Sequence, residues 1–198
     1  EVGRARVEKY GVVMFIVESL QRKLYEKIKE ALRQLSSEDV QRCCHNYEGS
    51  FAPISNYVQY LFSIKEDDDK VKNAIQLGTG QLYTKREFEK VNLQPLTDYN
   101  RHEVLVFFLN VLAENGDFVL ICIDELEKLQ ERSKVRFQNF LTSLRELIDL
   151  SSYINGHMLI VAMTDTAGKT GIPLESYNPA LERRISQYTY SLDCIKKD

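Results

Sequence analysis

Two adjacent carboxylates follow a short apolar run in the second half of the chain. The run extends from Leu120 to Ile123, and Asp124 and Glu125 come directly after it. If the run is a buried strand of a parallel sheet, both carboxylates emerge at the carboxyl edge, where open α/β sheets bind ligands. One carboxylate can then hold Mg²⁺ through water while the other polarises an attacking water, the two roles that phosphoryl transfer needs. The pattern also fits a buried strand that simply ends in two exposed acids.

A second apolar run ends in small polar residues about 35 residues further on. Leu159 to Met163 is followed by Thr164 and Asp165. From its position alone, the Thr164 hydroxyl at the end of a strand would cap the following turn.

Two adjacent arginines lie near the end of the chain. Arg183 and Arg184 belong to the segment Asn178 to Ile185, which is expected to be a short helix. A guanidinium donates paired hydrogen bonds to phosphate oxygens and keeps its charge, so either arginine could stabilise a phosphoryl group. Surface arginines on a short helix are the alternative.

In this order, the three segments resemble the core of ASCE-type P-loop NTPases of the AAA+ and STAND kind. Residues 120–125 are similar to a Walker B motif, residues 159–165 to the sensor 1 strand, and residues 178–185 to the segment that supplies an arginine finger to a neighbouring subunit. The resemblance covers residues 102–195 well and residues 10–35 loosely.

This resemblance implies a role for each polar residue. Asp124 would be the Mg²⁺-associated aspartate and Glu125 the catalytic base. Thr164, with Asp165 beside it, would contact the nucleotide, and Arg183 or Arg184 would be the finger. The implied cofactors are ATP and Mg²⁺, and the implied partners are other subunits or domains of an oligomeric ATPase. Hydrolysis would drive conformational switching or remodelling of a protein or nucleic-acid partner.

One required motif departs from the family pattern. A phosphate-binding loop reads Gly-x-x-x-x-Gly-Lys-Ser/Thr, and its backbone amides cradle the phosphates. The Gly-Lys pair at Gly168-Lys169 has Met163 where the motif needs its first glycine, and it does not lead into a helix. We therefore expect the loop and its helix upstream of Glu1, and we expect this chain alone to be inactive.

Two other functions compete with ATP hydrolysis. A degenerate, non-hydrolysing scaffold would keep the fold for protein assembly and would be indifferent to Glu125→Gln. A metal-dependent hydrolase or nuclease would use Asp124, Glu125 and Asp165 as ligands, but it needs further carboxylates or histidines at other strand ends.

The hydrophobic periodicity predicts the elements that position these residues. Continuous apolar runs predict buried strands at residues 11–17, 118–123 and 158–163, with a short fourth strand at 188–192. Spacing of 3.6 residues predicts helices over 20–35, 102–115 and 179–185, and a long helix after Glu125 with Val135, Phe137, Phe140, Leu141, Leu144 and Leu147 as its buried stripe. This alternation predicts an α/β fold, a P-loop NTPase-like parallel sheet sandwiched by helices.

Residues 40–100 interrupt that alternation. A helix is expected after Pro53, and Lys85 to Val91 could form another, so the segment is interpreted as a mostly helical insertion. The whole chain, residues 1–198, is then a single incomplete ATPase core that contains this insertion.

Composition excludes several classes of protein. The formal net charge of −3 excludes a broadly basic nucleic-acid wrapper, although the basic residues of segment 21–42 leave a local nucleic-acid contact open. No apolar stretch approaches the roughly 18 to 20 residues of a membrane span. The four cysteines form no Cys-x-x-Cys pair, which favours reduced thiols in a cytoplasmic protein over zinc, and the Cys43-Cys44-His45 cluster has poor geometry for a metal.

Overall fold

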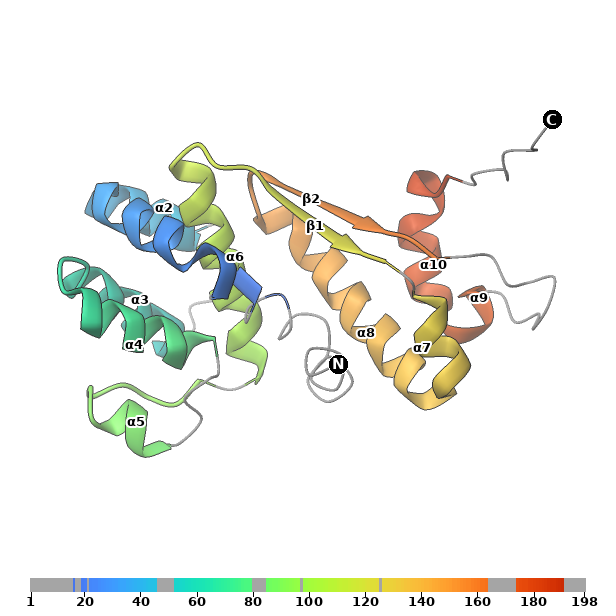
Figure 1. Ribbon diagram of the computed structural model, residues 1–198, viewed down its shortest axis with the longest axis horizontal. Helices are drawn as coiled ribbons and strands as arrows, with labels where there is room; N and C mark the ends of the chain where they lie inside the picture. Colours follow the sequence, from blue (N-terminus) through green and yellow to red (C-terminus); the bar gives the residue numbers. More distant parts are fainter. Residues whose placement is uncertain are drawn as a thin grey trace.

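A computed structural model provides the structure of the chain. It describes residues 16, 19–20, 22–45, 52–79, 85–96, 98–124, 126–163 and 174–190. In these residues the protein is mostly helical, with one two-stranded parallel sheet (Figure 1). The predicted α/β class therefore holds in a coarse sense.

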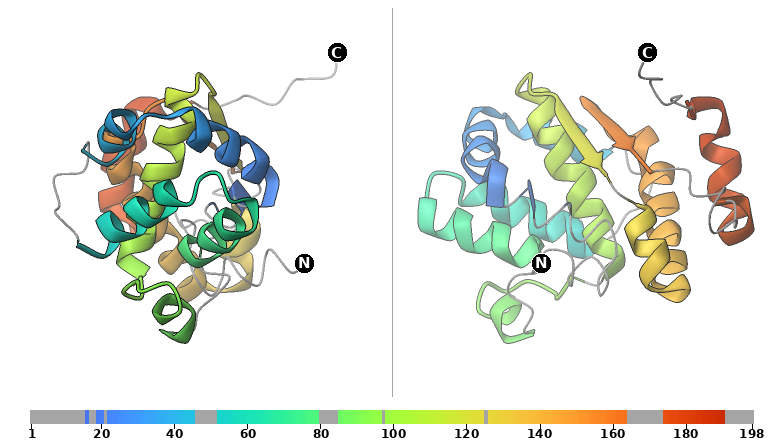
Figure 2. Two further views of the ribbon diagram at one scale, coloured as in Figure 1. Left: turned by 90° about the vertical axis from the view of Figure 1, so that its left-hand side faces the viewer. Right: turned by 45° about the vertical axis from the view of Figure 1, so that its right-hand side comes forward.

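The first part of the described chain is a group of helices, which we call the helical unit. It contains a helix over residues 22–34, α2 (Ser37–His45), α3 (Ala52–Ser63), α4 (Asp68–Gly78), α5 (Lys85–Glu89) and α6 (Asp98–Glu114). The helices expected over 20–35, after Pro53 and over 102–115 are present within these bounds. Figure 2 shows α2, α3 and α4 gathered on the same side of the long helix α6.

Local sequence explains where these helices begin. Ser36 and Asp39 form a reciprocal cap at the start of α2: the Asp39 amide donates to Ser36 Oγ at 3.2 Å, and the Ser36 amide donates to Asp39 Oδ2 at 2.8 Å. The Ser36 amide and the Ser36 hydroxyl both donate to the Asp39 carboxyl and lower its pKa. Asp67 caps α4 in a similar way by accepting from the Lys70 amide. The stretch from Ser36 to Asp39 is thus the start of a helix.

The second part of the chain contains the strands, and we call it the sheet unit. It comprises β1 (Val119–Ile123), α7 (Glu127–Arg132), α8 (Lys134–Leu150), the 3₁₀ turn η1 (Ser151–Tyr153), β2 (His157–Val161), α9 (Leu174–Tyr177), α10 (Pro179–Ile185) and the 3₁₀ turn η2 (Ser186–Tyr188). β1 and β2 pair in parallel, with Leu120 opposite Met158 and Cys122 opposite Ile160. Two of the predicted strands therefore pair in the predicted sense.

Helix α8 lies on one side of the two strands (Figure 1). Its stripe from Phe137 to Leu147 is buried as the spacing predicts, because residues three and four apart share a helix face. Val135 is the exception: it is 66% exposed and does not belong to the buried stripe.

The predicted fourth strand is not met, and the predicted strand 11–17 is tested at Ile16 alone. Tyr188 belongs to η2, and Thr189 and Tyr190 pair with no strand in the described chain, so the predicted fourth strand is wrong over these residues; residues 191–192 lie outside the described range. In the predicted strand 11–17, only Ile16 is described, and it is helical and buried.

A buried asparagine joins the two units. Asn110 of α6 is 1% exposed; its Nδ2 donates to the Tyr153 carbonyl at 2.9 Å and to the Cys43 carbonyl at 3.4 Å, while its Oδ1 accepts from the Asn155 amide at 2.8 Å. On the surface, Lys27 Nζ reaches Asp117 Oδ1 at 2.5 Å, just before β1, and lowers the pKa of that carboxyl. The core of the two units is continuous across this junction.

Candidate functional site

The carboxyl ends of β1 and β2 lie side by side, as parallel pairing in register requires. Beyond the last paired residues, the Ala162 amide donates to the Ile123 carbonyl at 2.8 Å. The Leu126 amide then donates to the Ala162 carbonyl at 3.4 Å. The segment that follows β1 therefore stays beside the segment that follows β2 for several residues.

Asp124 occupies this strand end. It is exposed, and the next described residue, Leu126, is 2% exposed and packs into the core. The buried leucine and its hydrogen bond to Ala162 fix the backbone around Asp124, so the carboxylate is held at the edge of the sheet. Glu125, Thr164 and Asp165, the other residues predicted at this edge, lie outside the described residues.

The chemistry of Asp124 fits a magnesium ion in one respect. Mg²⁺ prefers oxygen ligands, keeps several of its waters, and commonly takes only one or two carboxylates together with substrate phosphates. An exposed carboxylate at the carboxyl edge of a parallel sheet meets that requirement. Within the described ranges, no group of three or more His, Cys, Asp or Glu side chains could form a metal site made of protein ligands alone.

The predicted short helix that carries the two arginines is present as α10. Asn178 caps it by accepting from the Leu181 amide at 3.0 Å, Pro179 occupies its first turn, and Leu181 is fully buried. Tyr177 of α9 stacks edge-on against Phe137 near the start of α8, with ring centroids 5.0 Å apart. Helices α9 and α10 therefore pack along α8.

The structure distinguishes between the two arginines. Arg184 forms a forked ion pair with Asp149 of α8: its Nε contacts Oδ1 and its Nη2 donates to Oδ2 at 3.2 Å. Its Nη1 also donates to the Ala180 carbonyl at 2.9 Å. Arg183 is exposed and forms no ion pair with any residue that the structure describes.

The Arg184 guanidinium is held at the C-terminal end of α8. Asp149 is in the last turn of α8, from which the chain passes through η1 to the start of β2. Asp124 follows the end of β1, and the strands are parallel and about 16 Å long. Asp149, the partner of Arg184, therefore belongs to the segment that leads into β2, and Asp124 belongs to the segment that leaves β1.

Sequence reasoning missed Asp149 and Asn110. Nothing in the local sequence pairs Asp149 with an arginine 35 residues later, because that contact is created by the packing of α10 on α8. Asn110 did carry a signal: it is a lone polar residue between Val104 and Leu112, a segment of otherwise apolar side chains. A buried polar side chain in such a position requires hydrogen-bond partners.

The structure also bears on the adjacent cysteines and on the possibility of a membrane span. Burial raises the pKa of the Cys43 thiol to about 12 and that of Cys44 to about 11, so neither is a ready thiolate ligand. No helix among the described residues is both long enough and apolar enough to cross a bilayer.

Comparison of the chain with protein-family models, with curated proteins and with solved structures finds no match. The function must therefore be inferred from the residues and their arrangement.

Proposed function

We propose that this chain is part of an AAA+/STAND-like ATPase that hydrolyses ATP to drive conformational switching or remodelling of a protein or nucleic-acid partner. The observation that supports the proposal best is the parallel, in-register pairing of β1 with β2. The pairing puts the backbone around Asp124 beside Ala162, two residues before Thr164 in the sequence. Two strand-end segments with the residue types needed for phosphoryl transfer thus start from one sheet edge.

Each residue has a proposed task at this edge. Asp124 would hold Mg²⁺ through water, and the ion would neutralise charge on the phosphates. Glu125 would accept a proton from the attacking water, and Thr164, with Asp165 beside it, would orient the terminal phosphate. The phosphate-binding loop would come from polypeptide outside these residues.

For the arginine finger we propose Arg183 in place of Arg184. The Arg184 guanidinium is already held by Asp149 and the Ala180 carbonyl, and moving it to a phosphate would require breaking those contacts. Arg183 is exposed on the same helix and needs no such rearrangement to reach a neighbouring subunit. Its role would be to stabilise the negative charge that develops on the phosphate in the transition state.

The deciding experiment is ATP turnover by the longest natural form of the protein, beside its Glu125→Gln variant. We expect the variant to bind ATP but to hydrolyse it at least about a hundredfold more slowly, because the proton acceptor is lost. Glu131→Gln makes the same chemical change at an exposed position of α7 and should turn over ATP at the parent's rate. An intact parent that neither binds nor hydrolyses ATP would refute the proposal and leave the non-hydrolysing scaffold in its place.

A further inference from the structure

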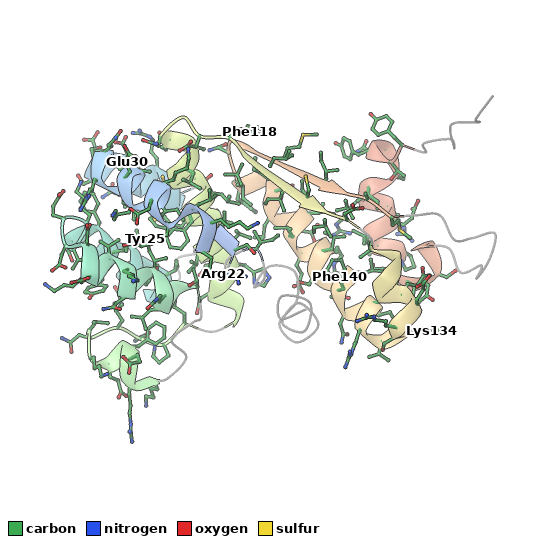
Figure 3. The ribbon with its side chains drawn as sticks, viewed as in Figure 1. Arg22, Tyr25, Glu30, Phe118, Lys134 and Phe140 are labelled. Carbon is green, nitrogen blue, oxygen red and sulfur yellow. The ribbon has the colours of Figure 1, made fainter. Side chains whose placement is uncertain are left out.

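Apolar side chains on the surface are concentrated on the two strands. Nine large apolar side chains in the described chain are exposed, and six of them belong to the strands or their immediate flanks. These six are Phe118, Leu120, Met158, Ile160, Val161 and Met163. Phe118 is 66% exposed, and it stands at the end of the sheet where β1 begins (Figure 3). A concentration of this kind on one small element marks an interaction surface.

The geometry of the strands places the exposed residues in the middle of β1 and β2 on one face of the sheet. Successive side chains of a strand point to opposite faces, and Leu120 lies opposite Met158 while Cys122 lies opposite Ile160. We call these four residues the outer face. The alternate residues Val119, Ile121 and Leu159 are less exposed and pack against the core. The outer face contains no charged side chain, so its partner must be apolar at the contact.

Parallel sheets are normally covered by helices on both faces, because the connections between parallel strands are usually helical. Here, α8 lies on one side of the strands, and no described element lies over the outer face (Figure 1). The outer face is thus an apolar surface of the type that a helix covers in other parallel sheets.

The size of the surface distinguishes between possible occupants. From the exposed fractions, Phe118, Leu120, Met158 and Ile160 present roughly 400 Å² of surface, whereas a standard protein interface buries about 800 Å² on each partner. An interface between two copies that used this surface alone would therefore be smaller than a standard protein interface. Two five-residue strands measure about 10 Å by 16 Å, and a helix about 10 Å in diameter matches that footprint.

We propose that the outer face binds an amphipathic α-helix of a partner polypeptide, with Leu120, Met158 and Ile160 packing against the apolar stripe of that helix. This inference goes beyond nucleotide chemistry and does not depend on it. The contact would bury an exposed apolar surface, and the polar side of the bound helix would face water.

Cys122 provides a reporter at the centre of this surface. It is exposed, whereas Cys43 is buried and Cys44 is partly buried. The raised pKa values of Cys43 and Cys44 keep both thiols protonated at pH 8, which makes them slow to alkylate. With Cys194→Ser as the background, the rate of alkylation by iodoacetamide reports the accessibility of Cys122.

The experiment measures this rate while a synthetic helical peptide is added. The peptide has 17 residues, the length of α8, with leucine on one face and lysine on the other. A second peptide of identical composition has its leucines distributed around the helix. We expect the amphipathic peptide to slow alkylation of Cys122 at least about fivefold at saturation, and the rearranged peptide to leave the rate unchanged.

Two variants test whether the protection occurs on the outer face. Ile160→Lys should abolish it, because a lysine beside Cys122 would be buried against the apolar stripe. Val135→Lys changes a β-branched apolar residue on α8 that is more exposed than Ile160, and this variant should retain the protection. Circular dichroism checks that both variants are folded.

Three results would overturn the proposal. The first is equal protection by the two peptides, and the second is protection that survives Ile160→Lys in a folded variant. The third is a dimer of the peptide-free chain, seen by sedimentation, that Ile160→Lys dissociates, because the occupant would then be a second copy.

Discussion

Helix α6 and strand β1 follow each other in the chain, yet their apolar residues have different surroundings. From Val104 to Leu112, every apolar side chain of α6 is at most 2% exposed, whereas Leu120 of β1 is 55% exposed. Helix α6 is surrounded by α2, α3 and α8, so its apolar residues are buried on all sides. Among the described residues, β1 packs against the core with one face only. The apolar residues of α6 are therefore buried within the described chain, whereas one apolar face of the two-stranded sheet is exposed.

The test with the largest expected effect compares two phenylalanines. Phe108 of α6 is fully buried, and Phe108→Ala should lower the free energy of unfolding by about 3–5 kcal/mol through lost burial and the cavity left behind. Phe118→Ala removes the same atoms from an exposed position and should change it by less than about 0.5 kcal/mol. Urea denaturation of the three proteins measures both effects. Similar losses in the two variants would mean that the sheet surface is already covered in solution.

The next test concerns the junction between the two units. Asn110→Ala leaves the Tyr153 carbonyl and the Asn155 amide without their partner, and it should cost about 2–3 kcal/mol. Asn115→Ala, at the exposed end of α6, removes only a surface hydrogen bond to Asp117 and should cost less than about 0.5 kcal/mol.

Hydrogen exchange tells whether the junction holds the units together. In Asn110→Ala we expect the amides of β1 and β2 to exchange faster while those of α4 keep their protection, because the hydrogen bonds of the asparagine go to Cys43, Tyr153 and Asn155 and not to α4. A uniform loss of protection would show that the two units unfold together and that the asparagine is simply one part of a common core.

Most helices could be predicted from the sequence because their burial is set by local spacing. The stripe of α8 and the cap at Ser36 are both patterns within a few residues. The strands β1 and β2 were also located correctly by their continuous apolar runs. Such runs show which surfaces need burial but do not identify what buries them. The expectation of a sheet covered on both faces thus fails for Leu120 and Met158 within the described chain.

The candidate site was predictable to a similar extent. Asp124 lies at the end of a parallel strand, as expected from the residues before it. The ion pair that holds Arg184 was not predictable, because its partner lies on another helix and is brought there only by packing. The sequence therefore offered two equivalent arginines where the structure distinguishes them.

A smaller effect on stability is expected from the ion pair between Arg184 and Asp149. Arg184 and Asp149 are both partly exposed, so a double-mutant cycle with Arg184→Ala and Asp149→Ala should give a coupling of about 0.5–1 kcal/mol. The coupling should decrease at high salt, because charges near solvent are screened. Arg183→Ala should show no coupling to Asp149→Ala. A coupling of the same size for Arg183 would contradict the distinction between the two arginines.

The smallest expected effect is a pH dependence inside the helical unit. Glu103 of α6 is 4% exposed; its Oε2 accepts from Asn100 Nδ2 at 3.0 Å, and its Oε1 has no hydrogen-bond partner among the described residues. Burial raises the pKa of this carboxyl, and the hydrogen bond from Asn100 opposes the rise only in part. The folded state therefore holds the Glu103 proton more tightly than the unfolded state does.

It follows that this group favours folding when it is protonated and opposes folding when it is ionised. As the pH rises from the ordinary glutamate pKa through the raised folded value, stability falls, and at neutral pH the full cost of the buried charge is present. Glu103→Gln removes that charge, so it should stabilise the protein at pH 7 by a few tenths of a kcal/mol. The advantage should shrink as the pH falls below the raised pKa.

Denaturation of both proteins between pH 4 and pH 7, with the exposed Glu131→Gln as the control, measures the difference. A Glu103→Gln variant that is less stable at pH 7 than at pH 4, relative to the parent, would mean that the ionised carboxylate has a partner in solution and that the interior of the helical unit is not as dry as its packing indicates.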